Sequence, residues 1–204
     1  MVLQFFLGFV ASFVASLPPG LLNLTSLKIS LEKGRRKSYH FALGVSLIIL
    51  FQSYFSLALL KYLNPKTETG AFIQIIGVFI FAVLSIYFFY SFFKEKKATK
   101  KKPSKIKNTF YFGLLLSSIN VLGIPYYCGV GSTLNAHGLL DFSHLSISAF
   151  VMGTAFGTFS LLSIYIVSAI KIEKKIGIIS RNSNFILGLI TLLVAILTLI
   201  QIFS

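Results

Sequence analysis

Residues 38–60 read SYHFALGVSLIILFQSYFSLALL and contain no Asp, Glu, Lys or Arg. A helix needs roughly 20 mostly apolar residues to cross the hydrocarbon core of a bilayer, so this stretch is long enough to span a membrane. Five further stretches without charge lie on either side of it, at residues 1–27, 69–93, 108–140, 142–170 and 182–204. The sequence therefore predicts six transmembrane spans.

The overall composition agrees with a membrane protein. Of the 204 residues, 55% are hydrophobic and 12% are charged, which is about half the charge of a typical soluble domain. Backbone amides in hydrocarbon must be satisfied within the protein, and the strict two-residue alternation of a membrane barrel is absent. We therefore expect one all-α, polytopic membrane domain.

The basic residues predict how the spans are oriented. The chain has 19 Lys and Arg against 5 Asp and Glu, giving a net charge of +14. Seventeen of the nineteen lie in three clusters, at residues 28–37, 94–107 and 171–181, which follow the first, third and fifth uncharged stretches. Because short basic loops stay on the cytoplasmic side, we expect both termini outside a bacterial inner membrane. The positive charge is thus a topology signal, and no nucleic-acid partner is expected.

The chain shows an internal repeat. Three short motifs occur in the same order in each half: Gly8-Phe-Val-Ala-Ser and Gly113-Leu-Leu-Leu-Ser, Phe41-Ala-Leu-Gly44 and Phe150-Val-Met-Gly153, and Ala82-Val-Leu-Ser85 and Ala195-Ile-Leu-Thr198. With three spans per unit, the second copy enters the membrane from the opposite side. We therefore expect two inverted three-helix repeats, residues 1–93 and 109–204, joined by a basic cytoplasmic linker at residues 94–108. Anionic membrane lipid attracts such a linker by about 1 kcal/mol per Lys.

Proline and glycine interrupt the first and fourth stretches at corresponding places. Pro18-Pro19-Gly20 lies in the first stretch, and Gly123-Ile-Pro125 lies in the fourth. Irregular backbone in mid-membrane is tolerated where it lines a cavity or is buried in protein, and paired interruptions in two repeats indicate a transporter binding site. Pro19, Gly20 and Pro125 are therefore candidate substrate-binding positions, with a simple packing kink as the alternative.

Polar residues near these interruptions complete the candidate site. Asn23 follows the first interruption, Ser117 and Asn120 precede the second on one helix face, and Gln52 lies in the polar turn of the second stretch. An amide offers both donors and an acceptor, which suits a zwitterionic solute. For each residue alone, the alternative is a hydrogen bond between helices.

Several chemistries are not expected from this sequence. The six uncharged stretches offer no ionisable relay, and the chain contains no catalytic triad, metalloprotease motif or phosphate-binding loop. The single cysteine, Cys128, excludes an internal disulfide and a six-span thiol–disulfide carrier. We expect no catalytic residue, no metal site and no cofactor, and hence no enzyme. Gly153 and Gly157 form a small-xxx-small pair that predicts close helix packing.

The chain resembles the family of LysE-type amino-acid exporters, which are small six-span proteins built from two three-span units. The residues that carry the resemblance are Pro19-Gly20-Leu21-Leu22-Asn23, Lys28, Gly34-Arg35-Arg36, Phe41-Ala42-Leu43-Gly44-Val45 and the stretch 113–120, which ends in Asn120. The resemblance implies export of amino acids or similar small metabolites, often by proton exchange.

Three positions depart from the pattern of that family. Leu21 stands where the family has a second proline, and Val121 replaces the proline that follows Asn120. Ile49 stands where many members carry an acidic residue in the second span. This last departure counts against proton coupling through that position and against cationic substrates.

Two functions from different classes follow from these features. The first is a transporter that exports neutral or zwitterionic small-molecule solutes by alternating access, with the solute between the two interrupted spans. The second is a non-transporting membrane scaffold or assembly factor whose basic cytoplasmic loops recruit partners. Either is compatible with a homo-oligomer.

Overall fold

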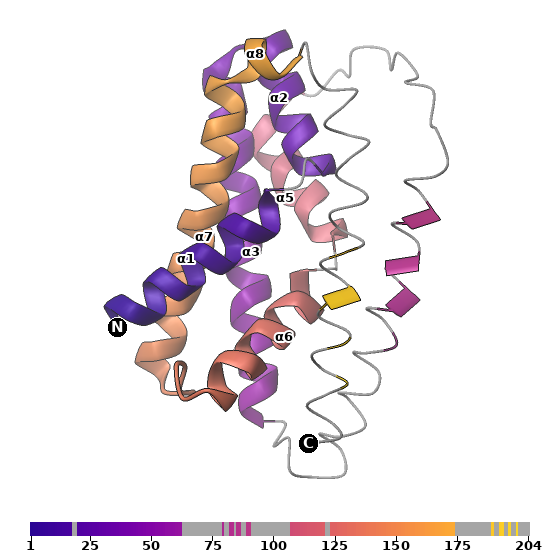
Figure 1. The fold of residues 1–204 in the computed structure, drawn as a ribbon. Coiled ribbons are helices and arrows are strands. Elements are labelled where there is room, and N and C mark those ends of the chain that lie inside the picture. Colours follow the sequence, from indigo (N-terminus) through magenta and orange to yellow (C-terminus); the bar gives the residue numbers. More distant parts are fainter. Residues whose placement is uncertain are drawn as a thin grey trace.

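The computed structural model describes residues 1–17, 20–62, 107–120 and 123–173, together with positions 79, 82, 83, 85, 86, 89, 90, 189, 192, 193, 196 and 199. All regular structure in these residues is helical, as the composition predicted (Figure 1). The helices are α1 (Val2–Ser16), α2 (Leu21–Lys33), α3 (Arg35–Tyr62), α5 (Thr109–Ile119), α6 (Gly123–Ala136), α7 (His144–Val167) and α8 (Ala169–Glu173).

The described residues contain two to four candidate membrane spans. Helices α3 and α7 are each long and apolar enough to cross a membrane alone. Helices α1 and α2 pass the same test only as a pair bent by 78°, and α5 and α6 pass as a pair bent by 66°. The predicted third and sixth spans, at residues 69–93 and 182–204, and nearly all of the linker at 94–108 lie outside the described residues.

The first interruption lies where the sequence predicted it. Helix α1 ends at Ser16 and α2 begins at Leu21, with Gly20 as an extended N-cap. Pro19 lies outside the described residues. The fixed φ of proline and its missing N–H explain why one straight helix does not run through this point.

The second interruption lies earlier than predicted. The sequence suggested a break at Gly123-Ile-Pro125, but α5 ends at Ile119 and α6 already begins at Gly123. Pro125 is the third residue of α6, within the first turn, where a helix leaves its N–H groups without internal partners. Proline is therefore accommodated in the first turn of this helix and does not break it.

The first basic loop is also shorter than predicted. The cluster at residues 28–37 was expected to form a loop, but α2 continues to Lys33 and α3 begins at Arg35. Only Gly34 separates them, and its φ of 83° lies in the left-handed region that glycine tolerates at a helix end. The Ser38 hydroxyl donates to the backbone oxygen of Ser26 at 2.6 Å, which closes this tight helical hairpin.

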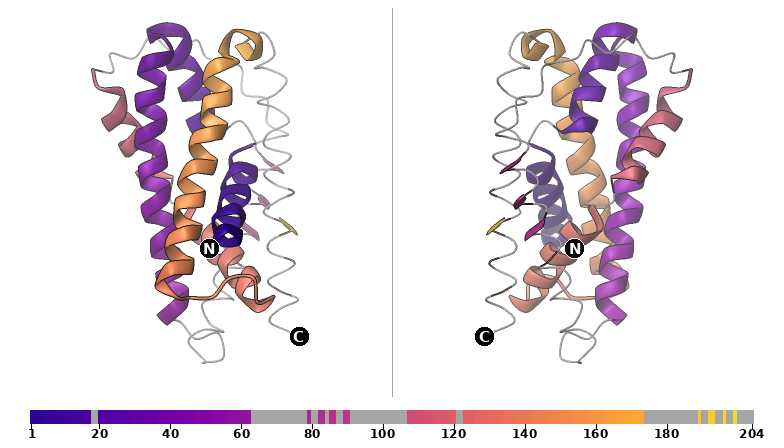
Figure 2. Two further views of the ribbon diagram at one scale, coloured as in Figure 1. Left: turned by 90° about the vertical axis from the view of Figure 1, so that its left-hand side faces the viewer. Right: turned by 90° about the vertical axis from the view of Figure 1, so that its right-hand side faces the viewer.

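The long helices α3 and α7 lie side by side, and the broken pairs pack around them (Figure 2). Helix α1 crosses α7, while α5 and α6 both contact α3. Both interruptions lie about halfway along α3 in Figure 1. This arrangement brings the ends of four short helices to the middle of the bundle.

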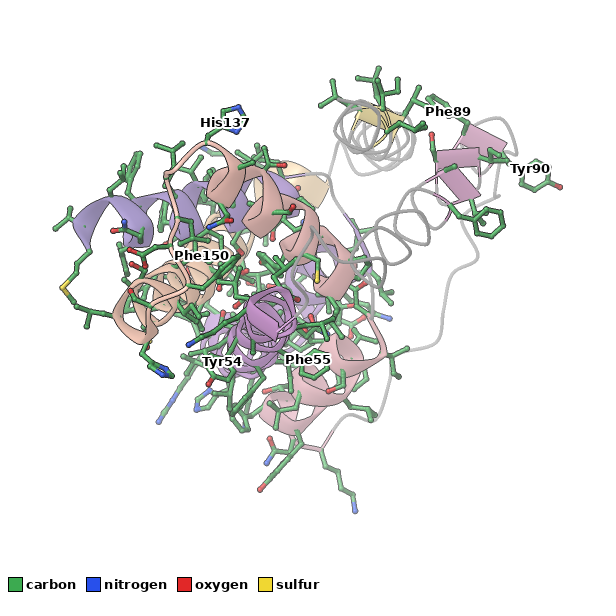
Figure 3. The ribbon with its side chains drawn as sticks, turned by 90° about the horizontal axis from the view of Figure 1, so that it is seen from below. Tyr54, Phe55, Phe89, Tyr90, His137 and Phe150 are labelled. Carbon is green, nitrogen blue, oxygen red and sulfur yellow. The ribbon has the colours of Figure 1, made fainter. Side chains whose placement is uncertain are left out.

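The side-chain pattern is the reverse of a soluble protein. Phe150 points into the bundle and is fully buried, whereas Tyr54 and Phe55 point outward from α3 with exposed fractions of 49% and 55% (Figure 3). Small polar side chains such as Ser12 and Thr154 are fully buried. Water would not stabilise this distribution, but lipid around the bundle would.

Candidate functional site

The carbonyl groups at the end of α1 are held by side chains from other helices. Asn23 Nδ2 donates to the backbone oxygen of Ser16 at 2.6 Å, and the Tyr165 hydroxyl donates to that of Leu17 at 3.0 Å. A helix leaves its last carbonyls without internal partners, and burying them unpaired would be costly. Helices α2 and α7 therefore stabilise the first interruption.

The end of α5 is held in a related way by α3. Gln52 Nε2 donates to the backbone oxygens of Ser117 at 3.3 Å and Asn120 at 3.2 Å. Four residues further along α3, the Ser56 hydroxyl donates to the backbone oxygen of Ile124 at 2.9 Å, just inside α6. One polar turn of α3 thus contacts both sides of the second interruption.

Two polar atoms at the second interruption have no hydrogen-bond partner among the described residues. They are Gln52 Oε1 and Ser117 Oγ, and the two side chains are 8% and 0% exposed. The amide orientation follows from the two carbonyls, because only the NH₂ end of Gln52 can donate to them. A Cβ at Gly123 would lie 2.5 Å from Gln52 Oε1. Any residue other than glycine at position 123 would therefore displace the Gln52 amide.

Hydroxyl groups join the helices near the interruptions. Ser12 Oγ lies 2.6 Å from Thr158 Oγ1 and 2.9 Å from the Tyr127 hydroxyl, which connects α1 to α7 and α6. Ser53 Oγ lies 2.9 Å from Thr154 Oγ1 and so connects α3 to α7. These interhelical bonds fix α1 and α6 relative to the two long helices.

The glycines between α1 and α7 allow very close packing of these two helices. On the α1–α7 side, a Cβ at Gly8 would overlap the backbone oxygen of Phe150, and one at Gly153 would overlap that of Phe5. Gly157 makes a contact of the same kind with α1. The prediction that Gly153 and Gly157 serve close packing is therefore confirmed.

The acidic groups that the structure describes lie at the ends of helices. Glu32 Oε1 lies 3.6 Å from Lys28 Nζ near the end of α2. Asp141 precedes α7 and accepts a hydrogen bond from the Ser143 hydroxyl at 2.6 Å, which holds the pKa of that carboxyl below its ordinary value. No group of three or more His, Cys, Asp or Glu suited to a metal ion occurs among the described residues.

The structure divides the predicted site residues between the two interruptions. Gln52, Ser117 and Asn120 meet at the second interruption through the bonds to the α5 carbonyls, and Asn120 is half-buried there. Gly20 and Asn23 lie at the first, where the Asn23 side chain is 4% exposed.

Sequence reasoning missed the hydroxyl contacts around Ser12 and Tyr127. These two residues are 115 positions apart, and neither lies in a pattern that indicates a partner. The repeat offered one signal, because Ser12 and Ser117 each follow a motif glycine by four residues.

A search of curated proteins and of solved structures found no match to this chain. The family model described as LysE type translocator matches residues 13–202, which include most of both broken helix pairs and both long helices. A translocator moves its solute across the membrane and leaves it chemically unchanged, so the chain is not an enzyme. With a match over nearly its whole length, the chain belongs to the LysE type translocator family of membrane transport proteins.

Proposed function

We propose that this chain exports amino acids or similar small neutral or zwitterionic metabolites by alternating access. The observation that carries the proposal is the second interruption, where helix ends and the unpartnered Gln52 Oε1 meet in the middle of an apolar-coated bundle. Broken helices at mid-membrane are the usual place where transporters bind solutes. The solute would lie between the two interruptions, beside Asn23 and Asn120 as well as Gln52 and Ser117.

The proposed architecture is six spans in two inverted repeats. Its support is that the glycine contacts of the α1–α7 pair recur in the α5–α3 pair. Positions in α5 follow those in α1 by 105 residues, and positions in α7 follow those in α3 by 109. A Cβ added at any of four glycines would meet a backbone oxygen of the opposing helix: Gly8 with Phe150, Gly113 with Phe41, Gly153 with Phe5, and Gly44 with Phe110.

The matching glycine contacts of the two helix pairs bear on how the repeats would move. In the α1–α7 and α5–α3 pairs, a helix from the first span of one repeat packs against the second span of the other. The two repeats therefore contact each other along two helix pairs. Small residues at such an interface let the two helices approach closely. Rocking of one repeat against the other would then expose the region between the interruptions to either side in turn.

Efflux from loaded vesicles tests this function. Purified protein is reconstituted into liposomes filled with a mixture of radiolabelled L-amino acids, and release is compared with protein-free liposomes. We expect saturable release of at least one amino acid, whether or not residues 96–105 of the basic linker are deleted. A lack of release across the whole mixture, combined with loss of a cellular phenotype on deleting 96–105, would support the scaffold function instead.

The same vesicles test how transport is driven. Because no carboxylate lies in the predicted spans, we expect release to be downhill, or coupled to an ion held by backbone carbonyls at the interruptions. Replacing any one acidic side chain by its amide should leave the rate within a few fold. The five positions are Glu32, Glu68, Glu95, Asp141 and Glu173. Uphill accumulation driven by a pH gradient and abolished by one of these variants would contradict this expectation.

Cysteine labelling tests the proposed orientation, with the α2–α3 hairpin in the cytoplasm. The Lys37 and His137 side chains are both exposed; Lys37 lies in the first turn of α3, and His137 directly follows α6. The start of α3 and the end of α6 lie at opposite ends of the bundle (Figure 1). In a Cys128→Ser background, we expect His137→Cys to react with an impermeant maleimide in intact cells, and Lys37→Cys to react only after permeabilisation. Ser38 is unsuitable for this purpose because it is fully buried. Reaction of Lys37→Cys in intact cells would reverse the orientation.

A further inference from the structure

The two repeats treat equivalent serines differently. Ser12 in α1 and Ser117 in α5 are 105 residues apart, the same separation as Gly8 and Gly113. Both serine side chains are 0% exposed. The Ser12 hydroxyl has two hydroxyl neighbours within hydrogen-bond distance, whereas the Ser117 hydroxyl has no partner among the described residues. The first repeat therefore uses its serine for structure, and the second repeat leaves it available.

The second buried atom without a partner is Gln52 Oε1, and its side chain already donates a hydrogen bond to the backbone of Ser117. Gln52 Nε2 lies 3.3 Å from the backbone oxygen of Ser117, while Gln52 Oε1 lies beside the backbone of Gly123 at the start of α6. The other buried side-chain atoms without a partner among the described residues are Gln4 Oε1 and Ser46 Oγ. Ser46 lies six residues from Gln52, or about 9 Å along α3, so it belongs to another level of the bundle.

A buried acceptor without a partner is costly, so native proteins seldom keep one without a reason. Here two such atoms lie at the junction of α5 and α6, Ser117 Oγ in the last turn of α5 and Gln52 Oε1 beside Gly123 at the start of α6. The end of a helix carries partial negative charge and its start carries partial positive charge. A zwitterion matches this junction, because its ammonium group can donate to the two unpartnered oxygens and its carboxylate suits the first N–H groups of α6.

We propose that Gln52 Oε1 and Ser117 Oγ bind the ammonium group of a zwitterionic solute at the α5–α6 interruption. This inference rests on the proposed transport function and assigns the solute's ammonium group to one side chain from each repeat, Gln52 from the first and Ser117 from the second. Both atoms are buried, so the solute reaches them when the repeats move apart. Gly123 permits the site because it leaves space for the Gln52 amide.

The experiment compares Ser117→Ala with its repeat equivalent, Ser12→Ala. The probes are a mixture of neutral L-amino acids, the same mixture N-acetylated, and the same mixture as carboxamides. Binding is measured as the rise in thermal unfolding midpoint, followed with a thiol-reactive dye on Cys128, the single cysteine, and transport as counterflow in liposomes.

We expect the amino-acid mixture to stabilise the wild type and both derivatised mixtures to have little effect. Ser117→Ala should fold as stably as the wild type, because it removes a hydroxyl that has no partner, but its apparent affinity should fall at least tenfold. Gln52→Leu should bind no better than Ser117→Ala. Ser12→Ala should unfold at a lower temperature and keep the preference for the free amino acids.

Three results would overturn this inference while leaving transport itself established. Ser117→Ala could bind and transport like the wild type, the N-acetylated mixture could bind equally well, or binding could vanish when choline replaces sodium, which would assign the two atoms to a metal cation. A wild type that neither binds nor transports the free amino acids would instead overturn the proposed function.

Discussion

Replacing Gly153 by alanine is expected to destabilise the folded protein by about 3 kcal/mol, the upper end of the range for overpacked cores. The added methyl group would overlap the backbone oxygen of Phe5 on α1. No change of side-chain rotamer relieves this contact, because the opposing atom belongs to the main chain. The two helices must move apart, which also disturbs the neighbouring contacts at Gly8 and Gly157.

Thermal unfolding in detergent measures this effect, with the dye reaction of Cys128 as the signal. For a chain of this length we expect a decrease in midpoint of roughly 10 °C. Ser148→Thr is the matched control, because it adds one methyl group to the exposed face of the same helix. The free energy of unfolding of Ser148→Thr should change by no more than about 0.5 kcal/mol, so its midpoint should stay close to that of the wild type. An unchanged midpoint for Gly153→Ala would mean that α1 and α7 do not pack this closely.

Replacing Gly123 by alanine is expected to reduce transport at least tenfold while the protein remains folded. The new Cβ would lie 2.5 Å from Gln52 Oε1, and the flexible Gln52 side chain can swing away. Its bonds to the backbone oxygens of Ser117 and Asn120 would then be lost, at about 1 kcal/mol each. Each 1.4 kcal/mol of binding free energy that is lost with the displaced amide lowers the solute affinity tenfold.

Gly131→Ala is the control for this experiment. It lies on the same helix, and its added methyl group would overlap the end of the Leu57 side chain, away from both interruptions. We expect a comparable loss of stability with transport retained. In Gly123→Ala combined with Gln52→Asn, the shorter amide avoids the new methyl group but no longer reaches the two carbonyls, so we expect neither stability nor transport to be restored. Full transport by Gly123→Ala would show that the Gln52 amide has no part in the pathway.

The sequence predicted the helical class of the fold and the places where two spans are interrupted. Both depend on local chemistry: uncharged stretches must be helical in lipid, and proline with glycine prevents one continuous helix. The exact positions were less certain from sequence alone. Pro125 lies in the first turn of a helix that it was expected to break, and Gly34 by itself makes a turn that was expected to occupy residues 28–37.

The candidate site was predicted only as a set of residue types near the interruptions. Gln52, Ser117 and Asn120 do meet, but the sequence did not indicate that the Gln52 amide would bind the carbonyls at the end of α5. Contacts between residues far apart in the chain depend on how the helices cross. The pairing of Ser12 with Tyr127 across 115 residues is such a contact.

The sequence by itself determined that this chain is a helical membrane protein with two interrupted spans, because charge distribution and backbone chemistry act locally. Only the tertiary structure decided which buried polar atoms find partners. Ser12 and Ser117 each follow a closely packed glycine by four residues and have the same side chain, yet one hydroxyl is paired and the other has no partner among the described residues. That difference arises from the opposing helices, where Thr158 faces the first serine, and it provides the strongest indication of where a solute binds.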